Sequence, residues 1–119
     1  DYDNVGSDGL NGIDALNEEN IINIFYSTNA DKITFELHMK LNQSKAKIFY
    51  HKVDDAHKNA LDFQLSSFLG WLIQGSPEHC YFVVSKDTGF NSLLSFWKER
   101  KANVSIVTDL MKQNVKDIE

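Results

Sequence analysis

This sequence of 119 residues has a single cysteine and no long apolar run. One cysteine excludes an internal disulfide, and because Cys80 lies in the apolar stretch 80–84, we expect a buried thiol. No apolar stretch approaches the length that crosses a membrane, and no secretory signal opens the chain. We therefore expect a cytoplasmic protein with one domain over residues 1–119 and no membrane partner.

Several motifs of common enzymes and binding proteins are also missing. The four histidines have no paired spacing typical of a zinc site. No serine lies in a nucleophile elbow, and no Gly-rich segment matches a phosphate-binding loop. The net charge of −5 argues against a broad basic face for nucleic acid. It fits better with clustered carboxylates whose charge is offset by bound cations.

Strand-like apolar runs alternate along the chain with helix-like apolar stripes. Short continuous runs predict buried strands, and apolar residues spaced three and four apart predict amphipathic helices. The predicted strands cover residues 21–26, 46–53, 81–85 and 103–107. The predicted helices cover residues 30–41, 59–74, 90–97 and 110–118, and residues 6–17 are expected to form a loop. Trp71 and Trp97 lie in helical stripes and are expected to be core residues.

This alternation predicts an α/β fold, a three-layer open parallel sheet with helices on both faces. Residues 82–84 are apolar in succession, as expected for a strand that is covered on both faces. Such a sheet needs a central strand before residues 21–26, and residues 1–4 resemble the carboxyl end of one. We expect the strand order 3-2-1-4-5, with the first strand truncated or only partly present in this sequence.

Three acids fall where such a sheet binds ligands, outside the carboxyl ends of its strands at the point where the strand order reverses. Asp87 follows a predicted strand, Asp1 would end the first strand, and Asp62 lies in the first turn of a predicted helix at the same edge. Taken singly, Asp62 suits a helix start and Asp87 a turn. Taken together, the three carboxylates would repel one another without a cation, and Mg²⁺ or Mn²⁺ prefers oxygen ligands.

Three segments resemble the acidic motifs of PIN-like domain ribonucleases, most closely those of the NYN branch. They are Asp-Tyr-Asp-Asn at 1–4, Lys-Asn-Ala-Leu-Asp at 58–62 and Val-Ser-Lys-Asp-Thr-Gly-Phe at 84–90. The resemblance spans nearly the whole chain. It implies one PIN-like, NYN-type domain with the sheet order given above, acting as a metal-dependent endoribonuclease on single-stranded RNA.

The resemblance also implies a role for each residue of the site. Asp1, Asp62 and Asp87 match the catalytic acids that hold Mg²⁺ or Mn²⁺. A further metal ligand would be Asp3 or Glu36, and the supporting residues would be Asn4 and Ser85. Lys58 and Lys86 flank the acids and are candidates to contact the phosphates of RNA.

One departure keeps other functions open, because Gly89 stands where many relatives carry another acid. A non-catalytic PIN-like module that binds RNA or a partner protein is one alternative. The other is a phosphatase of the haloacid-dehalogenase type, whose Asp-x-Asp-x-Val motif fits residues 1–5, with Asp1 as nucleophile and Asp3 as acid/base. That reading leaves Asp62 unexplained. A homodimer or a complex with a partner protein also stays open.

Overall fold

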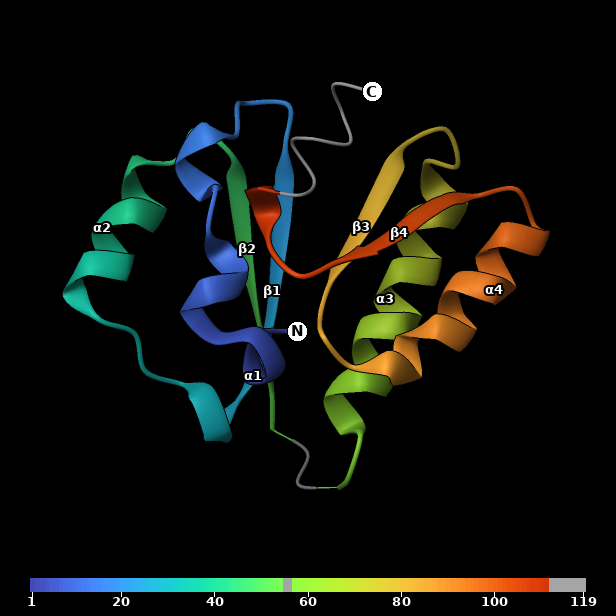
Figure 1. The fold of residues 1–119 in the computed structure, drawn as a ribbon, viewed down its shortest axis with the longest axis horizontal. Helices are drawn as coiled ribbons and strands as arrows, with labels where there is room; N and C mark the ends of the chain where they lie inside the picture. Colours follow the sequence, from blue (N-terminus) through green and yellow to red (C-terminus); the bar gives the residue numbers. More distant parts are fainter. Residues whose placement is uncertain (55–56, 112–119) are drawn as a thin grey trace.

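The structure, a computed structural model, describes residues 1–54 and 57–111 (Figure 1). The strands are β1 (Ile21–Ser27), β2 (Lys47–Val53), β3 (Cys80–Val84) and β4 (Asn103–Val107). The α-helices are α1 (Tyr2–Val5), α2 (Phe35–Gln43), α3 (Ala60–Gly75) and α4 (Asn91–Glu99). Short 3-10 helices are η1 (Gly6–Leu10), η2 (Ile13–Ala15), η3 (Thr28–Ala30) and η4 (Thr88–Phe90).

The strands pair in two parallel couples, β1 with β2 and β3 with β4. The predicted mixed α/β fold with parallel strands is therefore confirmed. Within the described ranges, however, these couples form two separate two-stranded sheets. The single three-layer sheet of order 3-2-1-4-5 is not confirmed.

Residues 2–4 do not form the end of a strand in the structure, because helix α1 already begins at Tyr2. The Asp1 carbonyl accepts the backbone N–H groups of Asn4 and Val5 at 3.1 and 3.2 Å, so the chain already turns into helix α1 at its first residue. Figure 1 shows the N-terminus beside the lower ends of the strands.

Two apolar clusters hold the helices against the strands. The first joins Leu65 and Leu69 of α3 to Phe25 of β1 and Val83 of β3. The second joins α2, η1 and η2 to the neighbouring residue of β1, Ile24. Successive residues of β1 thus point into different clusters, as the alternation of a strand requires. In Figure 1, α1 and α2 lie on one side of the strands and α3 and α4 on the other.

Helix α2 begins at Phe35 and not at the predicted residue 30. The reason is local, since the Thr34 hydroxyl oxygen accepts the backbone N–H of Leu37 at 3.0 Å and so caps the helix there. The predicted loop over 6–17 contains η1 and η2. The predicted helix over 110–118 lies outside the described residues beyond residue 111.

Two predictions about burial were wrong. Cys80 is exposed, because it is the first residue of β3 and lies at the open end of that strand. Trp71 of α3, predicted to be a core residue, is 72% exposed. Over the described part of the chain, no helix combines the length and the apolar character needed to cross a membrane.

Candidate active site

A pocket of about 490 Å³ lies at the carboxyl ends of β1, β2 and β3. We call it the acid pocket, because five of the residues that line it are aspartates: Asp1, Asp3, Asp54, Asp62 and Asp87. Asn4, Ser27, His57, Lys58 and Asn59 also line it. The structure therefore brings together Asp1, Asp62 and Asp87, which lie far apart in the sequence.

Ser85 connects the first and last of these acids. Its side chain is 2% exposed, and its hydroxyl donates to Asp1 Oδ2 at 2.7 Å. The same hydroxyl oxygen accepts the backbone N–H of Asp87 at 3.0 Å. Asn4 Oδ1 accepts the backbone N–H of Lys86 at 2.7 Å. Asn4 and Ser85 thus lie where they can hold the loop after β3 against the start of the chain.

Asp3 makes the corresponding connection to β1. Its Oδ1 accepts a hydrogen bond from the backbone N–H of Ser27 at 2.8 Å, and its Oδ2 accepts one from the Ser27 hydroxyl. Ser27 is the last residue of β1. Together, Asp1 and Asp3 place the first turn of the chain across the carboxyl ends of both β3 and β1.

Asp87 is held in a turn that involves Gly89, two residues later. Its Oδ1 accepts the backbone N–H of Gly89 at 2.9 Å, where η4 begins. A Cβ atom at position 89 would lie 3.1 Å from that oxygen, closer than ordinary van der Waals contact. A second acid at this position would therefore crowd Asp87 as well as repel it.

Asp62 enters the pocket from the first turn of α3. The preceding Asn59 has a left-handed backbone with φ of 65°, which asparagine tolerates better than most residues. Burial, and then the nearby Asp87 carboxylate, raise the pKa of Asp62, while the Asp1 amino group acts in the opposite direction. The two carboxylates therefore interact electrostatically across the pocket.

The amino group of Asp1 is also perturbed. Burial lowers its pKa to about 6, although the Asp3 and Asp62 carboxylates favour its charged form. The burial of this nitrogen thus outweighs the attraction of the two carboxylates for its charge.

The remaining predicted residues divide between the pocket and the outside. Lys58 lines the pocket, whereas neither Lys86 nor Glu36 is among its lining residues. Glu36 lies on α2 and pairs with Lys40 at 3.8 Å, because a spacing of four residues puts both on one helix face. The sequence reasoning missed Asp54, which directly follows β2. The rule that points to Asp87, an acid directly after a strand, would have found it.

The donor set suits a hard divalent cation, since the pocket offers carboxylate and amide oxygens and no thiol. As the side chains stand, no three histidine, cysteine, aspartate or glutamate residues in the described ranges form a group that could hold a metal ion. The chemistry of the pocket fits Mg²⁺ or Mn²⁺, while a closed set of ligands is not shown.

Comparison with protein families agrees with this geometry. The sequence model of the PIN domain family matches residues 1–107, a span that includes all five aspartates of the acid pocket. The chain belongs to the PIN domain family. PIN domains are typically nucleases and generally use divalent metal ions. No curated protein and no solved structure matches this PIN domain. The predicted PIN-like resemblance is confirmed, and the NYN branch is not.

Proposed function

We propose that this PIN domain is a metal-dependent endoribonuclease of the NYN type that cleaves single-stranded RNA. The observation that carries the proposal is the convergence of five aspartates on one pocket, from the first turn of the chain, the segments after β2 and β3, and the first turn of α3. Such a concentration of like charge is costly unless cations offset it. The predicted sheet order 3-2-1-4-5 is part of the same proposal, because it would put Asp1 and Asp87 at one edge.

In this proposal Asp1, Asp62 and Asp87 hold the ion, with Asp3 as a further ligand. When bound, Mg²⁺ or Mn²⁺ would supply Lewis acidity and lower the pKa of water. The other residues position these acids. Ser85 orients Asp1 and the backbone of Asp87, and the N–H of Gly89 holds one oxygen of Asp87.

Charge also limits how RNA can approach. Phosphate and carboxylate repel, so the acid pocket cannot accept the RNA backbone until a cation lowers its negative charge. Lys58 lines the pocket and can contact a phosphate from its rim. Binding should weaken as the salt concentration rises, since phosphate contacts release counterions. With glycine at position 89, we expect a metal requirement on the order of millimolar, because fewer charged ligands bind a cation less tightly.

The test is cleavage of end-labelled single-stranded RNA with Mn²⁺ and with excess chelator. Asp62→Asn should remove at least about 99% of the metal-dependent cleavage, the usual scale for loss of one electrostatic group at a reacting centre. Asp14→Asn is the matched control, because Asp14 is exposed on η2 and does not line the acid pocket. Binding of the same RNA and release of phosphate from a small phosphomonoester are measured in parallel.

Three results would contradict the proposal. Cleavage that persists in excess chelator would exclude the metal mechanism. RNA binding without cleavage at ample Mn²⁺ would favour a non-catalytic module. Phosphate release from the monoester that depends on Asp1 but not on Asp62 would favour the phosphatase alternative.

A further inference from the structure

A pocket of about 630 Å³ lies between helices α3 and α4, which Figure 1 shows side by side. From α3 its lining includes Asp62, Phe63 and Ser66, and from η4 and α4 it includes Phe90, Leu93, Phe96 and Trp97. These positions recur every three or four residues, so on each helix they form one stripe that faces the other helix. We call this space the aromatic pocket, because its lining is rich in phenylalanine and tryptophan.

Two of its rings are exposed to solvent. Phe63 is 69% exposed and Phe96 is 46% exposed. The guanidinium carbon of Arg100 lies 3.7 Å from the centroid of the Phe96 ring, and Arg100 Nη1 donates to the Phe96 carbonyl at 3.0 Å. Arg100 thus adds a positive charge beside an aromatic face. Phe63 and Phe96 present ring surface that a flat apolar ligand can cover.

Trp97 adds a hydrogen-bond donor that is not used. Its Nε1 is buried, and it has no hydrogen-bond partner among the described residues. The indole packs against Gly70 of α3, where a Cβ atom would lie 3.4 Å from Trp97 Cζ2. Nε1 and Cζ2 are bonded to the same ring carbon, so the N–H also lies between the two helices. A buried N–H needs an acceptor, and a ligand that displaces the exposed Phe96 ring can supply one.

The aromatic pocket adjoins the acid pocket, and the shared lining limits what can occupy it. Asn59, Asp62 and Asp87 line both pockets. Because carboxylates repel anions, the occupant of the aromatic pocket must be uncharged there. The ring surfaces favour a flat molecule, and the Trp97 N–H favours one with acceptors on its edge. A nucleobase has these features, and its own backbone phosphate would lie on the side of the acid pocket.

We propose that the aromatic pocket is a base-binding subsite, in which Phe63 and Phe96 stack the base of the nucleotide next to the phosphate at the acid pocket. This inference rests on the proposed function, which puts that phosphate there. Stacking depends little on sequence, because every base has a π-face. A base paired in a duplex cannot enter such a pocket, so the subsite would select single-stranded over double-stranded RNA.

The experiment compares binding of a short single-stranded RNA with binding of an abasic oligomer of equal length, which keeps the phosphates and loses the bases. Fluorescence anisotropy gives both affinities in the presence of Ca²⁺, which takes oxygen ligands and offsets the charge of the acid pocket. The wild-type chain should bind the RNA more tightly than the abasic oligomer, by roughly tenfold. Double-stranded RNA should bind no better than the abasic oligomer.

Phe63→Leu keeps an apolar side chain and removes the ring. It should weaken RNA binding by at least about fivefold and leave binding of the abasic oligomer unchanged, whereas Phe63→Tyr should retain the wild-type affinity. Trp71→Phe is the matched control, because Trp71 is an exposed aromatic residue of the same helix that lines neither pocket. This control leaves Trp97 as the only tryptophan. RNA, but not the abasic oligomer, should then change the Trp97 fluorescence.

Equal affinity of the wild-type chain for RNA and for the abasic oligomer would overturn the proposal. An unchanged preference for RNA in Phe63→Leu would do the same, provided that its thermal melt shows a folded protein. Self-association that disappears in Phe63→Leu, with no change in RNA binding, would identify a second copy of this chain as the occupant and exclude a base.

Cleavage with Mn²⁺, measured separately, distinguishes this proposal from the proposed function. Base-dependent binding that is lost in Phe63→Leu, with no cleavage of any RNA, would support the subsite and contradict the nuclease. Equal metal-dependent cleavage by the wild-type chain and Phe63→Leu, with no preference for RNA over the abasic oligomer in binding, would contradict the subsite and leave the nuclease supported.

Discussion

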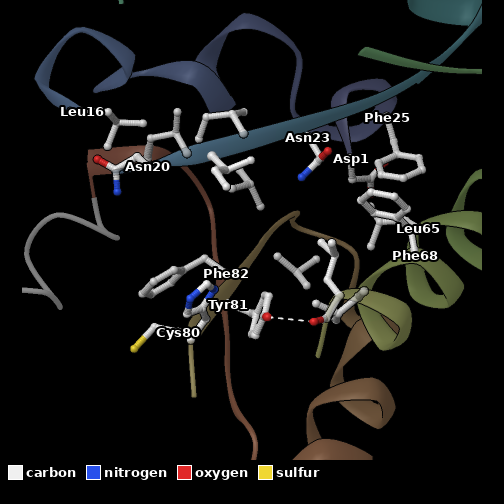
Figure 2. Close-up of a pocket in the computed structure, with 18 of the residues that line it drawn as sticks. Asp1, Leu16, Asn20, Asn23, Phe25, Leu65, Phe68, Cys80, Tyr81 and Phe82 are labelled. Atoms are coloured by element: carbon white, nitrogen blue, oxygen red, sulfur yellow. Dashed lines mark hydrogen bonds between the residues drawn. The ribbon is translucent and has the colours of Figure 1, made fainter. Parts of the chain in front are cut away.

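The acid pocket and the cavity of about 720 Å³ between β1 and β3, which we call the strand groove (Figure 2), both include Asp1 in their lining but are built from different interactions. In the pocket, side-chain oxygens of Asp1 and Asp3 accept hydrogen bonds from Ser85 and Ser27 at the strand ends. The Asp87 carboxylate accepts one from the backbone of Gly89 in η4, so close contacts hold each acid in place. Along the groove, β1, β3 and apolar side chains line a cavity. Among the described residues, no ladder of backbone hydrogen bonds joins β1 to β3 across it. Substitutions in the pocket should therefore affect chemistry and electrostatics, whereas substitutions at the groove wall should affect folding.

Leu69→Ala tests the groove side of this comparison and should have the largest effect on stability. Leu69 is 7% exposed and belongs both to the first apolar cluster and to the groove wall. Its truncation should lower the free energy of unfolding by about 2–5 kcal/mol, measured by urea unfolding. The exposed Gln64 on the same helix provides the control, since Gln64→Ala should change it by less than about 0.5 kcal/mol. A loss below 1 kcal/mol for Leu69→Ala would mean that this wall is not well packed.

Ser85→Ala tests whether the pocket also has a structural part. It removes a buried donor to Asp1 and a buried acceptor for the Asp87 N–H. The free energy of unfolding should fall by about 1–3 kcal/mol, and cleavage by folded protein should fall too. Ser67→Ala, at an exposed position of α3, should change neither quantity. Unchanged cleavage by Ser85→Ala would show that Asp1 and Asp87 need no such support.

Asp62→Asn should stabilise the protein slightly at neutral pH. Because the folded-state pKa of Asp62 is raised by burial and by Asp87, the folded state holds this proton more tightly than the unfolded state. Its contribution to stability is fully present below the unfolded pKa and is lost as the pH rises through the folded pKa. Asn keeps the uncharged state, so without metal the melting temperature at pH 7 should rise by roughly 2 °C. This difference should vanish below about pH 4, where Asp62 is protonated in both states. A lower melting temperature at pH 7 would show that the Asp62 carboxylate is structural.

Glu36→Gln should have the smallest effect. Glu36 is exposed, pairs with Lys40 and does not line the acid pocket. Its neutralisation should change the free energy of unfolding by less than about 0.5 kcal/mol and leave the Mn²⁺ requirement for RNA cleavage unchanged. A marked rise in that requirement would place Glu36 among the metal ligands after all.

Local patterns in the sequence were enough to predict the elements. The runs at 21–26, 46–53 and 103–107 fall on strands, because short runs rich in β-branched and aromatic residues favour an extended backbone. Element boundaries were less accurate, as at Phe35, where a single threonine hydroxyl sets the start of α2. The predicted burial of Trp71 was wrong, because a helical stripe indicates which residues share a helix face but not how far the neighbouring elements extend over that face.

The sequence by itself determined which residues are chemically suited to a metal site, and the general rule that parallel strands present such residues at their carboxyl ends. Tertiary structure alone decided that Asp54 and Lys58 join Asp1, Asp62 and Asp87 in one pocket, while Glu36 does not. It also decided that the described strands form two sheets with a groove between them. The physical reason is that strand pairing and pocket formation depend on contacts between distant segments. Propensity and periodicity act over only a few residues.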